Sequence, residues 1–196
     1  MIGNVRVIPS DDAPLVERAR YGDRRAFRLL FEQHSPRIYR VALRMLGQEA
    51  DARDLTQDVF IRAFNKLELL RDSARFGGWL LQLAMNLARD RLRQRRRFLW
   101  LPIGPPRFMD QPQTDWTLTA TDPGSEARAL QDELSVQIQR ALDSLSPDHR
   151  AVVVLHHLEG LSLEEIAASL DIRLGTVKSR LARARSDLRQ RLGRYV

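Results

Sequence analysis

Arginines, amides and an aromatic residue recur on one side of residues 76–97, where the spacing predicts an amphipathic helix. Five polar positions follow one another at steps of four, three, four and four residues: Gln82, Asn86, Arg89, Arg93 and Arg97. Trp79 precedes them by about one helical turn. A ring can stack on a base, an amide can read a base edge, and guanidiniums pair with phosphates. The segment is a candidate for binding single-stranded or distorted nucleic acid, although a core tryptophan beside a solvated arginine face has the same pattern.

A helix-turn-helix is predicted over residues 162–192. Ser162 and Glu165 have the spacing of a capping box at the start of the first helix. Ile166, Ala167 and Leu170 would face inward, and residues 171–173 would form the turn. The second helix opens at Gly175 and Thr176, and its apolar stripe consists of Val177, Leu181, Ala184, Leu188 and Leu192.

The opposite face of that second helix is polar and basic. It holds Lys178, Ser179, Ala182, Arg183 and Ser186, with Arg180 and Arg185 at its borders. From residue 173 onward there are eight basic residues and one acidic residue. A recognition helix needs this arrangement, because its centre reads bases in the major groove and its rims contact phosphates. The alternative is an ordinary helical hairpin with a solvated basic face.

Two zones of helical periodicity, residues 1–97 and 128–196, would position these two faces. Between them, residues 98–127 hold five of the nine prolines, with one basic residue against four acidic ones. Proline resists helix formation, so this segment is predicted to be a partly extended linker. Because strand-like alternation is lacking, we expect an all-α fold with two small helical domains joined by a proline-rich linker.

We expect four helices in the first zone. A stripe of Phe27, Leu30, Phe31 and His34 comes first; Ser35 would then cap a new helix that starts at Pro36 and ends at Gly47. The third starts near Asp51 and the fourth is the segment 76–97. The residues that these two helices bury are predicted to be Leu55, Val59, Ala63 and Leu67, and Phe76, Leu80, Leu83, Ala84 and Leu87.

The second zone begins with an apolar stripe and a helix start before the helix-turn-helix. The stripe consists of Leu130, Leu134, Ile138, Leu142 and Leu145. Ser146 and Pro147 would start the next helix, and Gly160 would end it.

The composition points to a polyanionic partner. The 196 residues include 32 basic and 25 acidic ones, for a net charge of +7, and 43% are hydrophobic. Nucleic acid and an anionic membrane surface both fit this charge. There are no cysteines, which excludes disulfides and thiolate zinc sites. No apolar run approaches the roughly 20 residues of a membrane span. We therefore expect a protein with no cofactor, no metal and no direct membrane insertion.

Two other classes of DNA-binding protein can carry a C-terminal helix-turn-helix. A DNA-processing enzyme such as a serine recombinase needs an α/β catalytic domain, and a response-regulator-type activator needs βα alternation and a phospho-acceptor aspartate. The N-terminal half has neither pattern. His156 and His157 are adjacent and cannot share a helical face, so they do not suggest a metal site. The sequence thus predicts a binding protein rather than an enzyme.

Six blocks of the chain resemble the extracytoplasmic-function (ECF) sigma factors, the smallest class (group IV) of the sigma-70 family. They are residues 22–27, 54–64, 76–80, 83–86, 161–167 and 175–180. The resemblance implies a region 2 domain over residues 1–97, a linker over 98–127 and a region 4 domain over 128–196. It also implies a factor that brings core RNA polymerase to promoters, recognises the minus-35 and minus-10 elements and melts the promoter, in a stress or envelope response.

The resemblance further implies roles for single residues. The core-polymerase-binding residues are Asp54, Gln57, Asp58 and Arg62. The minus-10 residues are Trp79, Gln82, Asn86, Arg89 and Arg93, with Asn86 at the position that receives a flipped base. The minus-35 residues are Thr176, Lys178, Ser179, Arg180, Ala182 and Arg183, and Ala182 stands where some members have a large aromatic. Judged by spacing alone, Asp54, Gln57 and Asp58 would be a solvated face.

The implied partners are RNA polymerase core, promoter DNA and an anti-sigma factor. Core polymerase would be contacted at the clamp helices of its largest subunit and at its flap region, with the linker running toward the RNA exit path. The protein would work in the cytoplasm at the nucleoid, and an anti-sigma factor could sequester it at the inner membrane.

Overall fold

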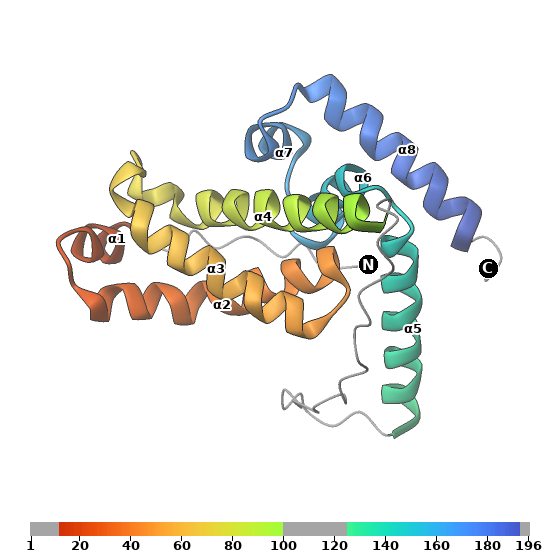
Figure 1. Ribbon diagram of the computed structural model, residues 1–196, viewed down its shortest axis with the longest axis horizontal. Coiled ribbons are helices and arrows are strands. Elements are labelled where there is room, and N and C mark those ends of the chain that lie inside the picture. The colour runs from red at the N-terminus through yellow and green to blue at the C-terminus, as the bar shows by residue number, and fades with distance from the viewer. Residues whose placement is uncertain (1–11, 100–124, 193–196) are drawn as a thin grey trace.

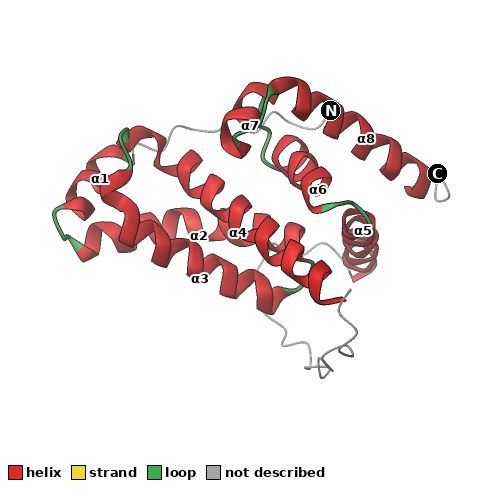
Figure 2. Ribbon diagram, turned by 45° about the horizontal axis from the view of Figure 1, so that its top comes forward, coloured by secondary structure: helices red, strands yellow, loops and turns green. Residues whose placement is uncertain are grey.

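A computed structural model describes residues 12–99 and 125–192 of the chain (Figure 1). In these two ranges every regular element is helical, as the sequence predicted, and there is no strand. The N-terminal half contains α1 (Ala13–Arg20), α2 (Arg24–Leu46), α3 (Glu49–Lys66) and α4 (Phe76–Leu99). Two short 3-10 turns, η1 (Leu67–Leu69) and η2 (Ser73–Arg75), connect α3 to α4. The three long helices α2, α3 and α4 pack side by side, with α1 across one end (Figures 1 and 2).

Helix α2 is one continuous helix, so the predicted restart at Ser35 and Pro36 is wrong. A proline inside a helix removes one backbone hydrogen bond and crowds the preceding turn. Here tertiary packing overrides that cost, because Leu30 and His34 before the proline and Ile38 after it are all buried in the same core. The helix begins where Asp23 accepts hydrogen bonds from the backbone N–H groups of residues 25 and 26. It ends, as predicted, at Gly47, whose φ is 79°.

Helices α3 and α4 have the predicted core. All four residues predicted for α3 are buried, and the helix starts two residues earlier than expected. On α4 the predicted residues are buried except Leu83, which is half-buried. A buried pair packs against the start of α4: His34 Nε2 and Asp12 Oδ2 lie 2.9 Å apart. A Cβ atom on Gly77 would lie 3.1 Å from the His34 ring, so glycine permits this close approach.

The helices reach slightly into the segment predicted as the linker. Helix α4 continues to Leu99 and α5 (Ser125–Asp143) begins at Ser125, so residues 98–99 and 125–127 are helical. The rest of the predicted linker lies outside the described residues. The remaining helices are α6 (Pro147–Val153), the π-helical turn η3 (Val154–Leu158), α7 (Leu163–Leu170) and α8 (Leu174–Leu192).

The predicted stripe on α5 is only partly buried. Leu142 and Leu145 lie in the core, but Leu134 is 57% exposed and Ile138 is 37% exposed. The first part of α5 projects away from the body of the molecule, so the periodic stripe continues beyond the surface that it could pack against (Figure 1). The next helix starts as predicted, with Ser146 as N-cap accepting from the His149 N–H at 3.2 Å. Gly160, with φ 68°, follows the π-helical turn.

The two halves of the described chain pack against each other and share one hydrophobic core. Helices α6 and α7 lie against α4, while α5, α6 and η3 contact α2 (Figure 2). Residues 151–155, which span the end of α6 and the start of η3, are all buried. The sequence pattern predicted two helical units but not this contact between them.

Candidate nucleic-acid interface

The helix-turn-helix is formed by α7 and α8 as the sequence predicted. The Ser162 N–H donates to Glu165 Oε2 at 2.8 Å, and the Glu165 N–H donates to Ser162 Oγ at 3.1 Å, which completes the capping box. Asp171 ends α7 in the left-handed conformation, with φ 52°. Aspartate tolerates this region better than most residues, because its short polar side chain can bond locally. Asp171 thus ends α7 and begins the turn that leads into α8.

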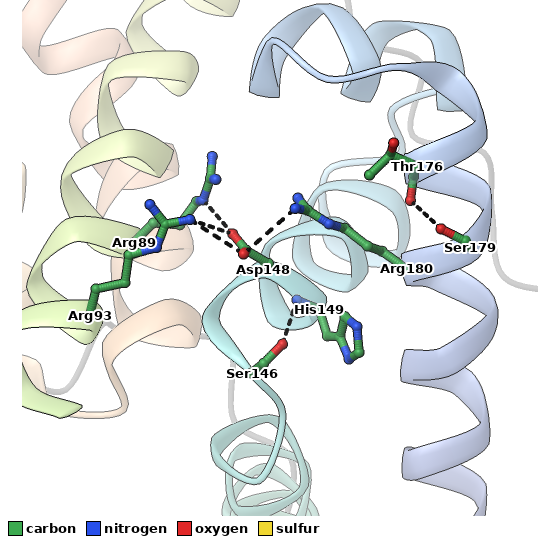
Figure 3. A network of polar contacts seen from close by, with 8 residues as sticks. All are labelled: Arg89, Arg93, Ser146, Asp148, His149, Thr176, Ser179 and Arg180. Atoms are coloured by element: carbon green, nitrogen blue, oxygen red, sulfur yellow. Dashed lines mark hydrogen bonds and ion pairs between the residues drawn. The ribbon is translucent and has the colours of Figure 1, made fainter. Parts of the chain in front are cut away.

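Helix α8 separates an apolar side from an exposed polar side. Val177, Leu181 and Ala184 are buried, and Leu188 is half-buried. The predicted groove residues Lys178, Ser179, Ala182 and Arg183 are all exposed. Thr176 is half-buried, and its carbonyl accepts a hydrogen bond from Ser179 Oγ at 3.0 Å (Figure 3). This surface can enter a major groove with its lysine and arginine free to contact bases and phosphates.

Arg180 does not share that free surface. Its side chain is 22% exposed and turns toward α6, where Nη2 lies 3.6 Å from Asp148 Oδ2. Two further arginines reach the same carboxylate from α4. Arg89 Nε donates to Asp148 Oδ1 at 2.9 Å, and Arg93 Nη2 lies 3.1 Å from Oδ1 and 3.3 Å from Oδ2 (Figure 3).

The electrostatics of this cluster keep Asp148 ionised. Partial burial of the carboxyl acts to raise its pKa, but the positive charges of Arg89, Arg180 and Arg93 together hold the pKa below its usual value. Asp148 also lies in the first turn of α6, where the helix macrodipole favours a negative charge. The single negative charge of Asp148 therefore faces three guanidinium groups.

The other residues predicted on α4 have mixed surroundings. Asn86 is exposed and Gln82 is half-buried. The Trp79 ring is half-buried and its centroid lies 6.1 Å from that of the core residue Phe76, so this aromatic belongs partly to the core. Arg97 lies on α4, but its side chain is outside the described residues. Within this row Asn86 and Arg93 are exposed, and Asn86 has no ion-pair partner among the described residues, so it is open to an incoming base.

On α3, three of the four predicted core-polymerase residues, Asp54, Gln57 and Arg62, are exposed. The fourth, Asp58, accepts a hydrogen bond from Arg91 Nη2 at 2.5 Å. Arg91 also donates to the Asp51 carbonyl at 3.1 Å, and so joins α4 to α3. Asp58 is consequently part of a structural ion pair rather than a purely solvated position.

Sequence reasoning missed two features beside these residues. One is Asp148. The other is a shallow groove of about 410 Å³ on α2 and α3, next to Gln57. Its lining consists of Arg24, Phe27, Phe31, Gln57, Phe60, Ile61, Phe64 and Asn65. The groove could have been anticipated from Ile61 and Phe64, which are apolar but lie off the buried stripe of α3.

Two further features, a metal-binding cluster and a membrane-spanning helix, are not found in the part of the chain that the structure describes. Residues 12–99 and 125–192 contain no cluster of three or more histidine, aspartate or glutamate side chains placed to hold a metal ion. Among the helices in these ranges, none combines the length and apolar character needed to cross a bilayer.

The fold and site thus define an all-helical protein with a C-terminal helix-turn-helix and a second polar helix face. Residues 30–98 match sigma-70 region 2, and residues 135–188 match sigma-70 region 4. The ECF RNA polymerase sigma factor SigE of Mycolicibacterium smegmatis is 41% identical over 166 residues, which are 85% of this chain and 61% of that protein. The ECF RNA polymerase sigma factor SigW of Bacillus subtilis is 32% identical over 180 residues, or 90% of this chain and 94% of that protein.

Two solved structures are similar as well. CnrH in complex with the cytosolic domain of CnrY has a TM-score of 0.64 and 27% identity, and the match covers 93% of this chain and 97% of that one. The sigma factor RpoE in complex with the anti-sigma factor NepR from Bartonella quintana has a TM-score of 0.63 and 26% identity. This match covers 85% of this chain and 96% of that one. The chain belongs to the sigma-70 family, and within it to the ECF sigma factors. Members of this class are promoter-specific transcription initiation factors that act with core RNA polymerase.

Proposed function

We propose that this sigma factor recognises its promoters with two separate helices, α8 for the minus-35 element and α4 for the minus-10 element. The observation that carries the proposal is the exposed polar face of α8 above a buried stripe. Lys178, Ser179 and Arg183 would read the groove there, with Thr176, Arg180 and Ala182 beside them. Because Ala182 is small, it leaves room at the groove that a large side chain would fill.

The minus-10 element would be bound as an opened strand by α4. Asn86 is exposed and presents both a donor and an acceptor, so it can distinguish base edges. Gln82 and Trp79 precede it on the same helix, and Arg89 and Arg93 follow it with charges for the backbone. Unstacking a base costs a few kcal/mol, which contacts in the pocket must offset.

Core polymerase would bind at α3 through Asp54, Gln57 and Arg62, with Asp58 supporting the surface through Arg91. The groove next to Gln57 adds apolar area to this polar face. Charged rims around an apolar centre are common in protein interfaces. The clamp helices of the largest polymerase subunit are the proposed partner of α3, and the flap region that of the C-terminal half.

An anti-sigma factor is the proposed inhibitor, because the similar RpoE was solved in complex with the anti-sigma factor NepR. The proposed site of action is the nucleoid in the cytoplasm, and inhibition could hold the protein at the inner membrane during the absence of a stress or envelope signal. The proposed role is one of binding and positioning.

In vitro transcription with core polymerase and a pool of promoters tests the proposed assignment. The promoters that the wild-type protein transcribes should share one minus-35 sequence and one minus-10 sequence. Lys178→Ala should lose selection at the minus-35 element, and Asn86→Ala at one base of the minus-10 element. Unchanged selection in both variants would refute the division of labour between α8 and α4.

A further inference from the structure

The network around Asp148 brings together residues that the proposed function assigns to two distant DNA elements. Arg89 and Arg93 belong to the minus-10 helix, and Arg180 belongs to the minus-35 helix. All three contact one carboxylate on α6 (Figure 3). In this arrangement Arg89 is 12% exposed and Arg180 is 22% exposed. Their guanidiniums are therefore turned away from the solvent through which a phosphate would arrive.

The distance between the two promoter elements makes this arrangement incompatible with full promoter binding. Elements centred near minus 35 and minus 10 are separated by about 25 base pairs, or roughly 85 Å along straight B-DNA. Arg93 and Arg180, by contrast, lie within 3.1 Å and 3.6 Å of the same aspartate. The two halves must separate before α4 and α8 can occupy both elements.

We propose that Asp148 acts as an internal substitute for DNA phosphate, holding the promoter-binding arginines of α4 and α8 together and keeping the free protein in a closed form. This inference rests on the proposed function of the two helices. A carboxylate and a phosphate are alternative partners for the same guanidinium, so promoter DNA and Asp148 compete for these arginines.

The local structure fits a contact that can be exchanged. One negative charge faces three positive ones, so opening frees more positive than negative charge. Arg180 Nη1 is buried and has no hydrogen-bond partner within the described part of the chain, which makes the closed position of that side chain incompletely satisfied. The DNA backbone offers several phosphates, each with two anionic acceptor oxygens like those of a carboxylate, so the three arginines no longer have to share one acceptor group.

Other contacts also join the halves, and they provide a matched control. Arg37 Nε on α2 donates to Glu159 Oε2 after η3 at 2.5 Å. Neither residue belongs to the proposed DNA contacts. Glu159→Gln and Asp148→Asn remove the same charge, and both break contacts between the halves: one ion pair for Glu159 and two for Asp148. Only Asp148→Asn releases promoter-binding arginines.

The first readout is the affinity of the free protein for a forked promoter fragment that carries both elements. It is measured by fluorescence anisotropy at fixed salt. Asp148→Asn should bind about tenfold more tightly than wild type, since it removes charge-assisted hydrogen bonds that compete with DNA. Glu159→Gln should gain clearly less. Equal gains in the two variants, or none in Asp148→Asn, would overturn the proposal.

The second readout is the separation of the two halves. Because the chain lacks cysteine, Gln33→Cys on α2 and Gln190→Cys on α8 give two exposed labelling positions for fluorescence energy transfer. Energy transfer should be high in free wild type and lower in Asp148→Asn, and Asp148→Glu should restore it in part. A low transfer efficiency in free wild type would contradict the closed form.

Transcription with core polymerase separates failure of this inference from failure of the proposed function. Suppose that wild type transcribes selectively while Asp148→Asn changes neither DNA binding nor the distance between the two labels. The proposed competition between Asp148 and DNA is then wrong, and the proposed function stands. If Asp148→Asn opens the protein but neither it nor the wild-type protein supports transcription, the proposed function is wrong.

Discussion

The polar faces of α8 and α4 follow the same helical pattern, but they differ in what covers them. On α8, Lys178, Ser179 and Arg183 are exposed. On α4, Arg89 and Arg93 are held by a carboxylate from α6, which follows 59 and 55 residues later in the chain. Periodicity therefore shows which side of a helix is polar. Whether that side is free depends on residues from elsewhere in the fold.

The comparison implies different behaviour for the two helices in the free protein. The exposed face of α8 is available for duplex DNA before the protein opens. On α4, Arg89 is only 12% exposed, and we expect it to become available when Asp148 releases it. This difference can be tested with single substitutions, because both helices keep a buried stripe that is separate from their polar residues.

The largest effect is expected on α8. Lys178→Ala combined with Arg183→Ala should weaken binding to a minus-35 duplex about a hundredfold, because each good base contact contributes about 1–3 kcal/mol. Affinities over a panel of altered sites, measured at fixed salt, separate base readers from phosphate contacts. The control is Arg189→Ala, which removes an exposed positive charge near the end of the same helix. If the control weakens binding as much, general charge rather than groove reading explains the affinity.

A smaller, more selective effect is expected from Asn86→Ala on α4. Loss of an amide that reads one base edge should reduce discrimination at that base about tenfold and slow promoter opening. Binding to core polymerase and to the minus-35 duplex should be unchanged. Permanganate footprinting over promoters substituted at each minus-10 base measures the change. Undiminished selectivity would mean that Asn86 is only a solvated helix residue.

Arg93→Ala should separate the free protein from the holoenzyme. Free protein should bind a forked minus-10 fragment as well as wild type does, because Asp148 already holds this arginine. In the holoenzyme the same change should weaken minus-10 binding severalfold, since one phosphate contact is lost. Anisotropy with and without core polymerase provides the comparison. An equal loss in both states would show that Arg93 is already free before opening.

The smallest effect concerns α3, where the exposed carboxylate of Asp54 and the paired carboxylate of Asp58 lie about one helical turn apart. Asp54→Arg should weaken core binding without changing the melting temperature, because Asp54 is exposed. Asp58→Arg should additionally lower stability by about 1 kcal/mol, because Arg91 loses its partner. Thermal melts and core-binding titrations measure both, with Glu68→Arg as an exposed charge reversal outside this face. Equal melting temperatures for the two variants would show that the Asp58–Arg91 pair contributes no stability.

Much of the fold could be predicted because its signals are local. The capping box of Ser162 and Glu165, the turn at Asp171 and the stripe of α8 all depend on residues within a few positions of one another. The failure at Pro36 has a different origin. Proline is a local signal against a helix, but the buried residues on both sides stabilise a continuous α2.

The candidate site was less predictable where contacts join distant segments. The pairing of Arg91 with Asp58 crosses 33 residues, and that of Arg89 with Asp148 crosses 59. Nothing in the spacing of either partner indicates such a contact. The exposure of Leu134 was missed for a related reason, because periodicity predicts an apolar face but not where the packing surface ends.

The requirement that the two halves separate for promoter recognition can be tested by preventing separation. Arg37→Cys and Glu159→Cys replace an ion pair that joins the halves outside the proposed DNA contacts, in a chain with no other cysteine. A cleavable thiol crosslinker between these positions would hold the closed form. With core polymerase, the crosslinked protein should fail to transcribe from a promoter with both elements, and cleavage should restore transcription. Full transcription from the crosslinked protein would contradict the account.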